Sequence, residues 1–330
     1  MTNDHVIVFA DADPPMVPLM VGERLARVEA LGAFAVHQGR AADAADYETR
    51  IADATAIMIG WDLPVEVMRK APRLEAISYL GTGAANMIDL PEAAARGITV
   101  CNTPGYGDNA VAEHALALLF AVARDIPRLD RTLRTEGWDQ LAPGFELRGK
   151  TLGLIGLGGI GSRVAELAGA LGMEVLAWTR NPSPERARRS GVTFAPLEAV
   201  LGQSDVISLH LLLTPETENL LGAAELDRMK PGAVFINTAR AELVDEAALI
   251  ERLRDRRIAA AGIDVYLQEP LPRDHPLLGL DNVVATPHIG FNTPEATMAM
   301  VDFGIDNLVR YFAGDPINVI TAPEICNISE

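Results

Sequence analysis

The segment TLGLIGLGGIG, residues 151–161, joins an apolar run to glycines at positions 156, 158 and 161. Where a strand turns directly into a helix, the first glycine permits the tight turn, the second lets a pyrophosphate approach the backbone, and the third lets the helix pack on the strand. The helix start also offers unpaired amides and a positive dipole end to phosphates. We therefore favour a dinucleotide site over a purely structural turn. Its expected cofactor-binding residues are Gly156, Gly158, Gly159, Ile160 and Gly161.

The tip of the next apolar run distinguishes the two nicotinamide cofactors. Residues 175–178 lead into Thr179 and Arg180, at a place where an acid would accept hydrogen bonds from the ribose hydroxyls of NAD(H). A hydroxyl and a guanidinium suit a 2′-phosphate instead, because arginine binds phosphate through two parallel bonds. We expect NADP(H) as the favoured cofactor. NAD(H) is the alternative if Arg180 only points to solvent.

Short apolar runs alternate with amphipathic stretches on both sides of this segment. The expected strands before it are 6–9, 33–36, 54–60, 74–80 and 98–102, and those from it onward are 151–155, 174–178, 205–210, 233–237, 258–264 and 282–285. Such alternation is typical of parallel sheets covered by helices. We predict an α/β protein with two doubly wound parallel-sheet domains, Rossmann-like or flavodoxin-like.

Two further segments complete this organisation. A helix rich in alanine and leucine is expected at 109–123, followed by a polar stretch at 124–150 that is either a solvated excursion or an arm that embraces another subunit. A last helix is expected at 294–312.

Composition narrows the class of protein. The 330 residues are 49% hydrophobic and carry a formal charge of −17, which predicts two packed domains and disfavours nucleic acid and anionic membranes as partners. The longest apolar run, 115–123, is shorter than the roughly 20 residues of a membrane span, and we see no signal peptide. Only Cys101 and Cys326 are present, so we expect free thiols and a cytoplasmic location.

Three polar residues follow apolar runs in the second half of the chain: Arg240, Glu269 and His288. In open α/β sheets the loops at the carboxyl ends of strands line the ligand crevice. Taken singly, each residue has a plainer interpretation, either a surface ion pair or a histidine that caps a turn. Spacing along the chain does not show that the three meet.

Ordered motifs cover nearly the whole chain. They are GTG at 81–83 with ID at 88–89, NTPG at 102–105 with VAEH at 111–114, ELRGKT at 146–151, NTAR at 237–240 with LVDE at 243–246, AGIDV at 261–265, EPL at 269–271 and TPHIG at 286–290. With these motifs the sequence resembles the D-isomer-specific 2-hydroxyacid dehydrogenase family, whose members include glyoxylate/hydroxypyruvate reductases and phosphoglycerate dehydrogenases. The resemblance implies a substrate domain at 1–101 and 290–330, a dinucleotide domain at 102–289, and a dimer arm at 124–150, hence a homodimer.

The resemblance also implies roles for individual residues. His288 resembles the family's acid/base, Glu269 its partner, and Arg240 its clamp for the substrate carboxylate. Reduction of a 2-oxo acid needs a proton on the carbonyl oxygen, which an imidazolium beside a carboxylate supplies. The backbone N–H groups of Thr82 and Gly83 are expected to help hold the substrate carboxylate. The remaining residues expected near the nicotinamide are Thr238, Ala239, Asp264, His288 and Gly290, with Asp264 bonded to its carboxamide.

The resulting prediction is an NAD(P)-dependent 2-oxo acid reductase that needs no metal. Glyoxylate or hydroxypyruvate ranks above 3-phosphoglycerate, because no arginine beside Tyr79 and Leu80 is available for a substrate phosphate. The loop 83–89 is one residue longer than the common family pattern. Phosphoglycerate dehydrogenase activity is one alternative. The other is a nucleotide-sensing interaction protein, since corepressors of the same fold keep the three catalytic residues.

Overall fold

The computed structural model describes residues 4–321, and the chain divides into two units. The first comprises Met1–Gly107 with Asn292–Glu330, and the second comprises Asp108–Phe291. The boundaries expected from sequence lay at 101/102 and 289/290. In the structure the two breaks lie at 107/108 and 291/292, six and two residues further along the chain.

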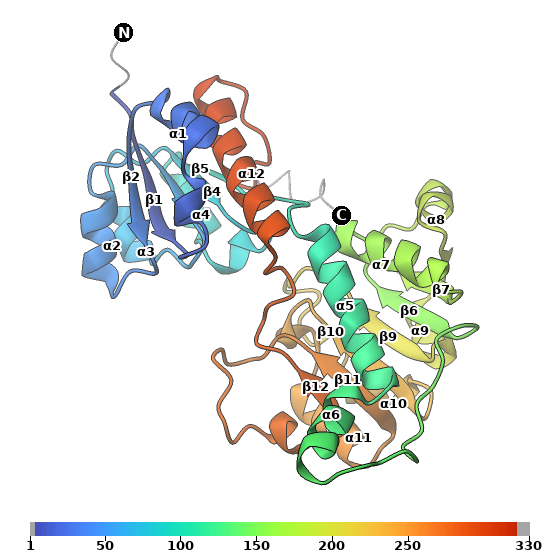
Figure 1. Cartoon of the computed structure of the whole chain (residues 1–330). Coiled ribbons are helices and arrows are strands. Elements are labelled where there is room, and N and C mark those ends of the chain that lie inside the picture. The colour runs from blue at the N-terminus through green and yellow to red at the C-terminus, as the bar shows by residue number, and fades with distance from the viewer. Residues whose placement is uncertain (1–3, 322–330) are drawn as a thin grey trace. The chain divides into compact units, whose positions relative to one another are not determined.

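The first unit is built on a five-stranded sheet whose strand order is β2-β1-β3-β4-β5, with every pair parallel. The strands are β1 (Val6–Ala12), β2 (Ala33–Gln38), β3 (Ala56–Ile59), β4 (Ala76–Tyr79) and β5 (Thr99–Cys101). The helices are α1 (Gly22–Glu29), α2 (Ala44–Ile51), α3 (Val65–Arg69), α4 (Leu90–Ala95) and α12 (Pro294–Phe312), with short 3₁₀ turns η1 (Val17–Leu19) and η2 (Ala84–Asn86). Helices α2 and α3 lie on one face of the sheet, and α1 and α12 lie on the other (Figure 1).

Helix α12 returns the end of the chain to this first sheet. Gly304 permits the close approach, because a Cβ there would lie 2.4 Å from Leu80 Cδ2. Asn307 is fully buried and donates from Nδ2 to Ser78 Oγ at 3.2 Å and to the Asn102 carbonyl at 2.8 Å. These bonds satisfy polar groups that burial would otherwise penalise. Two distant parts of the sequence therefore form one core.

The second unit contains a seven-stranded parallel sheet of order β12-β11-β10-β9-β6-β7-β8. Its strands are β6 (Thr151–Ile155), β7 (Glu174–Trp178), β8 (Thr193–Phe194), β9 (Val206–Leu209), β10 (Ala233–Asn237), β11 (Ile258–Ile263) and β12 (Val283–Ala285). Its helices are α5 (Asp108–Ala123), α6 (Ile126–Thr135), α7 (Gly159–Ala170), α8 (Pro184–Ser190), α9 (Leu197–Gln203), α10 (Ala223–Arg228) and α11 (Glu246–Arg254), with 3₁₀ turns η3 (Ala241–Leu243) and η4 (Pro276–Gly279).

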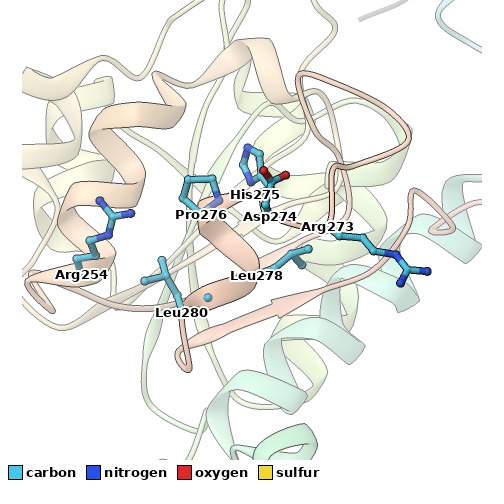
Figure 2. Close-up of a pocket in the computed structure, with 8 residues that line it drawn as sticks. Arg254, Arg273, Asp274, His275, Pro276, Leu278 and Leu280 are labelled. Carbon is cyan, nitrogen blue, oxygen red and sulfur yellow. The ribbon is translucent and has the colours of Figure 1, made fainter.

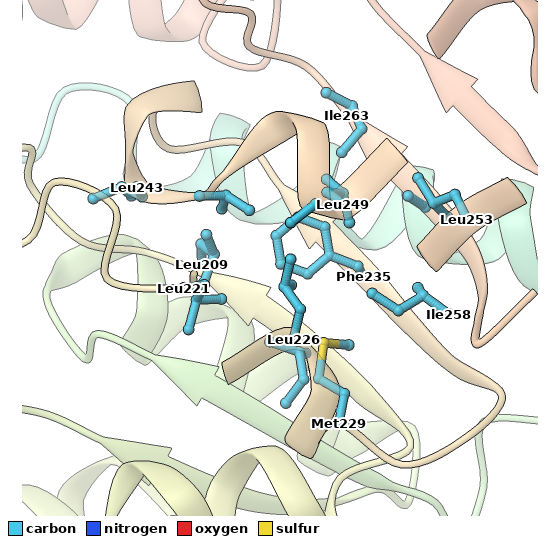
Figure 3. Close-up of a cluster of buried hydrophobic side chains, with 14 of the residues drawn as sticks. Leu209, Leu221, Leu226, Met229, Phe235, Leu243, Leu249, Leu253, Ile258 and Ile263 are labelled. Atoms are coloured by element: carbon cyan, nitrogen blue, oxygen red, sulfur yellow. The ribbon is translucent and has the colours of Figure 1, made fainter. Parts of the chain in front are cut away.

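Alternation along strand β10 builds a core on each face of this sheet. Phe235 is fully buried in the cluster under α9, α10 and α11, as Figure 3 shows. Val234 and Ile236 belong to the opposite cluster, under α5 and α7. A strand buried on both faces is apolar throughout, which is why its sequence shows a continuous apolar run.

The expected α/β class with two parallel sheets is confirmed. The strands expected at 151–155, 174–178 and 233–237 have these bounds in the structure. The polar stretch 124–150 contains helix α6, which was not predicted. Strand β8, only two residues long, was not predicted.

Two expectations concern the membrane and the thiols. Among residues 4–321, no helix is both long enough and apolar enough to cross a membrane. Cys101 is a buried free thiol, and burial raises its pKa to about 12. Cys326 lies outside the described residues.

Candidate active site

The glycine segment forms a cradle that only glycine fits. Gly156 has φ +101°, and a Cβ there would lie 2.2 Å from the His210 carbonyl oxygen. A Cβ on Gly161 would lie 2.5 Å from the Gly156 oxygen. Helix α7 begins at Gly159 after Gly158, which supplies no side-chain cap, so the first amides of α7 are available to a ligand. The chain thus fits a dinucleotide diphosphate at this helix start.

The tip of β7 lies next to this cradle in the sheet. Thr179 is buried and Arg180 is exposed. Arg186, on α8, donates to the Asn181 carbonyl at 2.9 Å and to the Leu157 carbonyl at 2.7 Å, and so ties the loop after β7 to the glycine loop. Arg186 was not predicted as a site residue, because its position in the sequence does not indicate such a bridge.

Three neighbouring strands bring the catalytic candidates to one sheet edge. Asn237, Ile263 and Ala285 stand in register at the carboxyl ends of β10, β11 and β12. Arg240, Glu269 and His288 lie on the loops that leave these ends. The register, which the sequence does not show, therefore places all three at the edge where open α/β sheets bind ligands.

His288 and Glu269 form a direct pair. His288 Nδ1 lies 2.8 Å from Glu269 Oε2, and Glu269 Oε1 accepts from the Tyr266 amide at 3.0 Å. Because an ionised carboxylate only accepts, Nδ1 carries the proton of this bond and Nε2 is left for a substrate. The Tyr266 hydroxyl donates to the Thr286 carbonyl at 2.9 Å, which holds the Glu269 loop against the His288 loop.

The loop that carries His288 is held by a buried carboxylate. His288 has φ +53°, a left-handed conformation that is unfavourable for a residue with a Cβ. The amides of Ile289 and Gly290 donate to the two oxygens of Asp264 at 3.0 and 2.8 Å. Asp264 is only 1% exposed. It therefore stabilises the turn that presents the imidazole.

Two further side chains complete this network. Thr286 Oγ1 donates to Asp264 Oδ1 at 2.6 Å, and His114 Nε2 lies 3.0 Å from Thr286 Oγ1. Burial raises the pKa of Asp264, but hydrogen bonds from His114, Thr286 and the two amides outweigh it and hold that pKa below its ordinary value. In the sequence His114 is only the last residue of the motif at 111–114, and its place beside Asp264 is shown by the structure. Bonding of Asp264 to the nicotinamide carboxamide stays a prediction.

Two hydrogen bonds of the Asn237 side chain stabilise the loop that carries Arg240. Asn237 Nδ2 donates to the Arg240 carbonyl at 2.9 Å, and Asn237 Oδ1 accepts from the Ala239 amide at 3.0 Å. Thr238 Oγ1 is buried and has no hydrogen-bond partner within the part of the chain that the structure describes. A buried hydroxyl without a partner is costly, so this atom fits a site that a ligand completes.

Thr82 and Gly83 belong to the first unit, after strand β4. Asn102 Nδ2 donates to the Thr82 carbonyl at 3.2 Å. Their joint action with Arg240 stays a prediction.

A surface hollow in the second unit is a different feature (Figure 2). It is lined by Arg254, at the end of α11, and by residues around η4, including Arg273 and His275. These residues precede β11 and β12, so the hollow lies at the amino ends of the strands, away from His288. Among residues 4–321, no group of three His, Cys, Asp or Glu side chains could hold a metal ion.

A dinucleotide cradle and a histidine–carboxylate pair on one parallel sheet define a nicotinamide-dependent oxidoreductase. The sequence model of the D-isomer specific 2-hydroxyacid dehydrogenase NAD binding domain matches residues 116–290. The chain belongs to this family, and it is an oxidoreductase that acts on the CH–OH group of 2-hydroxy acids.

Three similar proteins illustrate the relationship. A glyoxylate reductase of Aeropyrum pernix is 39% identical over 288 residues, which are 83% of this chain and 86% of that protein. A D-3-phosphoglycerate dehydrogenase of Archaeoglobus fulgidus is 43% identical over 79% of this chain, but the match spans only 50% of that longer protein. The solved structure of an NADPH-dependent glyoxylate/hydroxypyruvate reductase from Sinorhizobium meliloti, in complex with NADP and malonate, superposes with a TM-score of 0.82 at 32% identity, covering 96% of this chain and 97% of that one.

The Asp264 network predicts a pH-dependent loss of stability. Asp264→Asn removes an acceptor from one of the two amides, so we expect the free energy of unfolding at pH 7 to fall by about 1–3 kcal/mol. A carboxyl whose folded pKa is lowered stabilises the fold above its unfolded value, so the difference from the native chain should shrink below about pH 4. Denaturant unfolding at the two pH values measures it. Asp281→Asn, at an exposed ion pair with Arg256, is the control and should change stability by less than ~0.5 kcal/mol.

Proposed function

We propose that the protein is an NADPH-linked reductase of a small 2-oxo acid, glyoxylate or hydroxypyruvate, and that it also runs in reverse on the (D)-2-hydroxy acid. The observation that carries this proposal is the 2.8 Å contact between His288 Nδ1 and Glu269 Oε2, at the sheet edge that also bears Arg240. The relatives named glyoxylate reductase and glycerate dehydrogenase support the substrate class.

In this mechanism the nicotinamide supplies the hydride, and the chain's own residues move the proton. His288 donates a proton from Nε2 to the substrate's carbonyl oxygen during reduction and takes it back during oxidation. Glu269 stabilises the protonated imidazole and fixes its orientation through Nδ1. Arg240 binds the substrate carboxylate in a planar two-point contact, which selects the face of the carbonyl that reacts. Thr82 and Gly83 amides assist at that carboxylate.

Loss of the acid/base should abolish turnover and spare binding. We expect His288→Ala to lower kcat for glyoxylate reduction by about 10²–10⁴-fold, with NADPH still bound.

Glu269→Gln should displace the pH–rate profile for reduction toward lower pH, because the imidazolium loses its charged neighbour. Absorbance at the nicotinamide band, with glyoxylate, hydroxypyruvate, pyruvate and 3-phosphohydroxypyruvate as substrates, measures both.

The same assay separates the alternatives. Preference for the phosphorylated acid would make the chain a phosphoglycerate-type dehydrogenase, as the name of one relative suggests. Cofactor binding without oxidation by any of these acids would contradict the reductase and favour the nucleotide-sensing interaction protein. Unchanged turnover in His288→Ala would refute the acid/base assignment.

We further propose that NADP(H) is preferred over NAD(H). Arg180 is exposed at the tip of β7, and Thr179 there brings no charge that would repel a phosphate. The NADPH and NADP in the solved structures of two relatives support this choice.

Arg180 should therefore set the cofactor preference. Removal of a charged hydrogen-bond donor costs about 1.5–3 kcal/mol, so Arg180→Ala should weaken NADPH binding by about ten- to a hundredfold and leave NADH binding nearly unchanged. Fluorescence titration of both cofactors gives the two dissociation constants. Arg188→Ala, an exposed arginine on α8, is the matched control. An equal loss for both cofactors would contradict a 2′-phosphate contact.

We also propose a cytoplasmic homodimer in which residues 124–150 form the arm. Helix α6 has no buried residue, and Leu133, Trp138 and Leu141 are 57%, 81% and 93% exposed. Apolar side chains gathered on one protruding segment are typical of an interface with another subunit.

The arm should be needed for dimerisation. Exchange of both Trp138 and Leu141 for serine removes two exposed apolar anchors, so we expect the dissociation constant of the dimer to rise by at least about a hundredfold. Sedimentation velocity over a range of concentrations measures this. Val21→Ser, at an apolar side chain of the first unit that is 61% exposed, is the control. A native chain that sediments as a monomer would refute the dimer.

A further inference from the structure

A carboxylate rests against the start of helix α7, where the family's NAD binding domain receives phosphate groups. Asp108 is the first residue of α5, and its Oδ2 lies only 1.9 Å from the place that a Cβ on Gly159 would occupy. The carboxyl carbon lies 2.6 Å from that place. The Asp108 side chain thus fills the space that a side chain on Gly159 would take, and the glycine is what permits the approach.

This carboxylate is partly buried and is not neutralised by a counter-ion. Within residues 4–321, the Asp108 carboxylate forms no hydrogen bond and no ion pair. Burial raises the pKa of Asp108, with no charged group contributing. An unpaired, partly desolvated anion is unfavourable, so its position calls for a compensating field.

The positive ends of two helices supply that field. Asp108 lies in the first turn of its own helix α5 and against the first residue of α7. Other charged or titratable side chains on these two helices lie further along: Glu113 and His114 on α5, and Arg163 and Glu166 on α7, where Arg163 pairs with Glu166 at 2.6 Å. The α7 helix start therefore interacts with an anion of the chain itself.

We propose that Asp108 is an internal competitor of the cofactor diphosphate at the start of α7, so that the chain binds a dinucleotide more tightly when this side chain is neutral. Two anions at one helix start repel each other, because they carry like charges and are stabilised by the same dipole end. Binding of the diphosphate must then either displace the carboxylate or protonate it. Cofactor affinity thus becomes coupled to pH through a residue that takes no part in the chemistry.

The sign of this coupling follows from linkage. A ligand that favours the protonated carboxyl raises its pKa, so binding takes up a proton. Affinity should therefore increase as pH falls toward the range in which Asp108 titrates. The affinity should decrease as pH rises and become constant at high pH, where Asp108 is fully ionised and every binding event must displace or protonate the carboxylate.

The test uses ADP-ribose, which carries the diphosphate but lacks the nicotinamide ring that His288 would face. Isothermal titration calorimetry between about pH 5.5 and 8.5 measures its affinity for the whole chain. We expect Asp108→Asn to bind ADP-ribose about tenfold more tightly than the native chain at the high-pH end, because the repulsion between two like charges at close range is removed. The variant should also lose most of the pH dependence and the proton uptake.

Two further variants keep the result interpretable. Glu113→Gln removes one negative charge from the exposed side of the same helix and should bind ADP-ribose as the native chain does. Asp108→Ser, a smaller neutral residue that also suits a helix start, should reproduce the effect of asparagine.

Weaker binding in both neutral variants would overturn the proposal, because it would show that the carboxylate accepts a hydrogen bond from the ligand. Equal affinity and an unchanged pH profile would overturn it as well. The inference rests only on dinucleotide binding by this unit. If the reductase proposal fails for every 2-oxo acid, the ADP-ribose titration still decides whether Asp108 competes.

Discussion

The buried carboxylate of Asp264 is the constraint on which the candidate site depends. It accepts hydrogen bonds from the amides of Ile289 and Gly290. These two bonds hold His288 in a left-handed conformation that is unfavourable for a residue with a Cβ. The same turn brings Nδ1 to Glu269. Without the carboxylate, nothing would fix the distance between the His288 and Glu269 side chains, which lie on separate loops. The strain at His288 is thus offset by charge-assisted bonds one and two residues further along.

An acidic chain must still bind anions, and it does so with few cations. The net charge is −17, yet the proposed ligands carry phosphates and a carboxylate. The groups that we propose to bind them are the first amides of α7, the loop amides near Thr82, and two arginines at the ends of strands, Arg180 and Arg240. Backbone amides bring no net charge, so the attraction is short-ranged and confined to the site. In that setting a single carboxylate at Asp108 has a large influence on affinity.

Much of the fold was predictable because each signal is local. Continuous apolar runs at 151–155 and 233–237 belong to strands buried on both faces. Gly156 and Gly161 are required because a Cβ would meet the His210 carbonyl oxygen and the Gly156 oxygen, respectively. Helix α6 was not predicted because most of its residues, in the sequence IPRLDRTLRT, are charged or polar. Strand β8 was missed because two residues show no period.

The sequence by itself determined the class of fold, the dinucleotide cradle and the identity of Arg240, Glu269 and His288 as candidates, because residue type and strand-end position are properties of the chain. Only the tertiary structure decided that His288 pairs with Glu269 rather than capping a turn, that Asp264 and His114 stand behind it, and that Asp108 lies on Gly159. Glu269 and His288 are 19 residues apart and Asp108 and Gly159 are 51 apart, by their numbers in the chain. Contacts at such separations depend on strand register and helix packing, which no local pattern encodes.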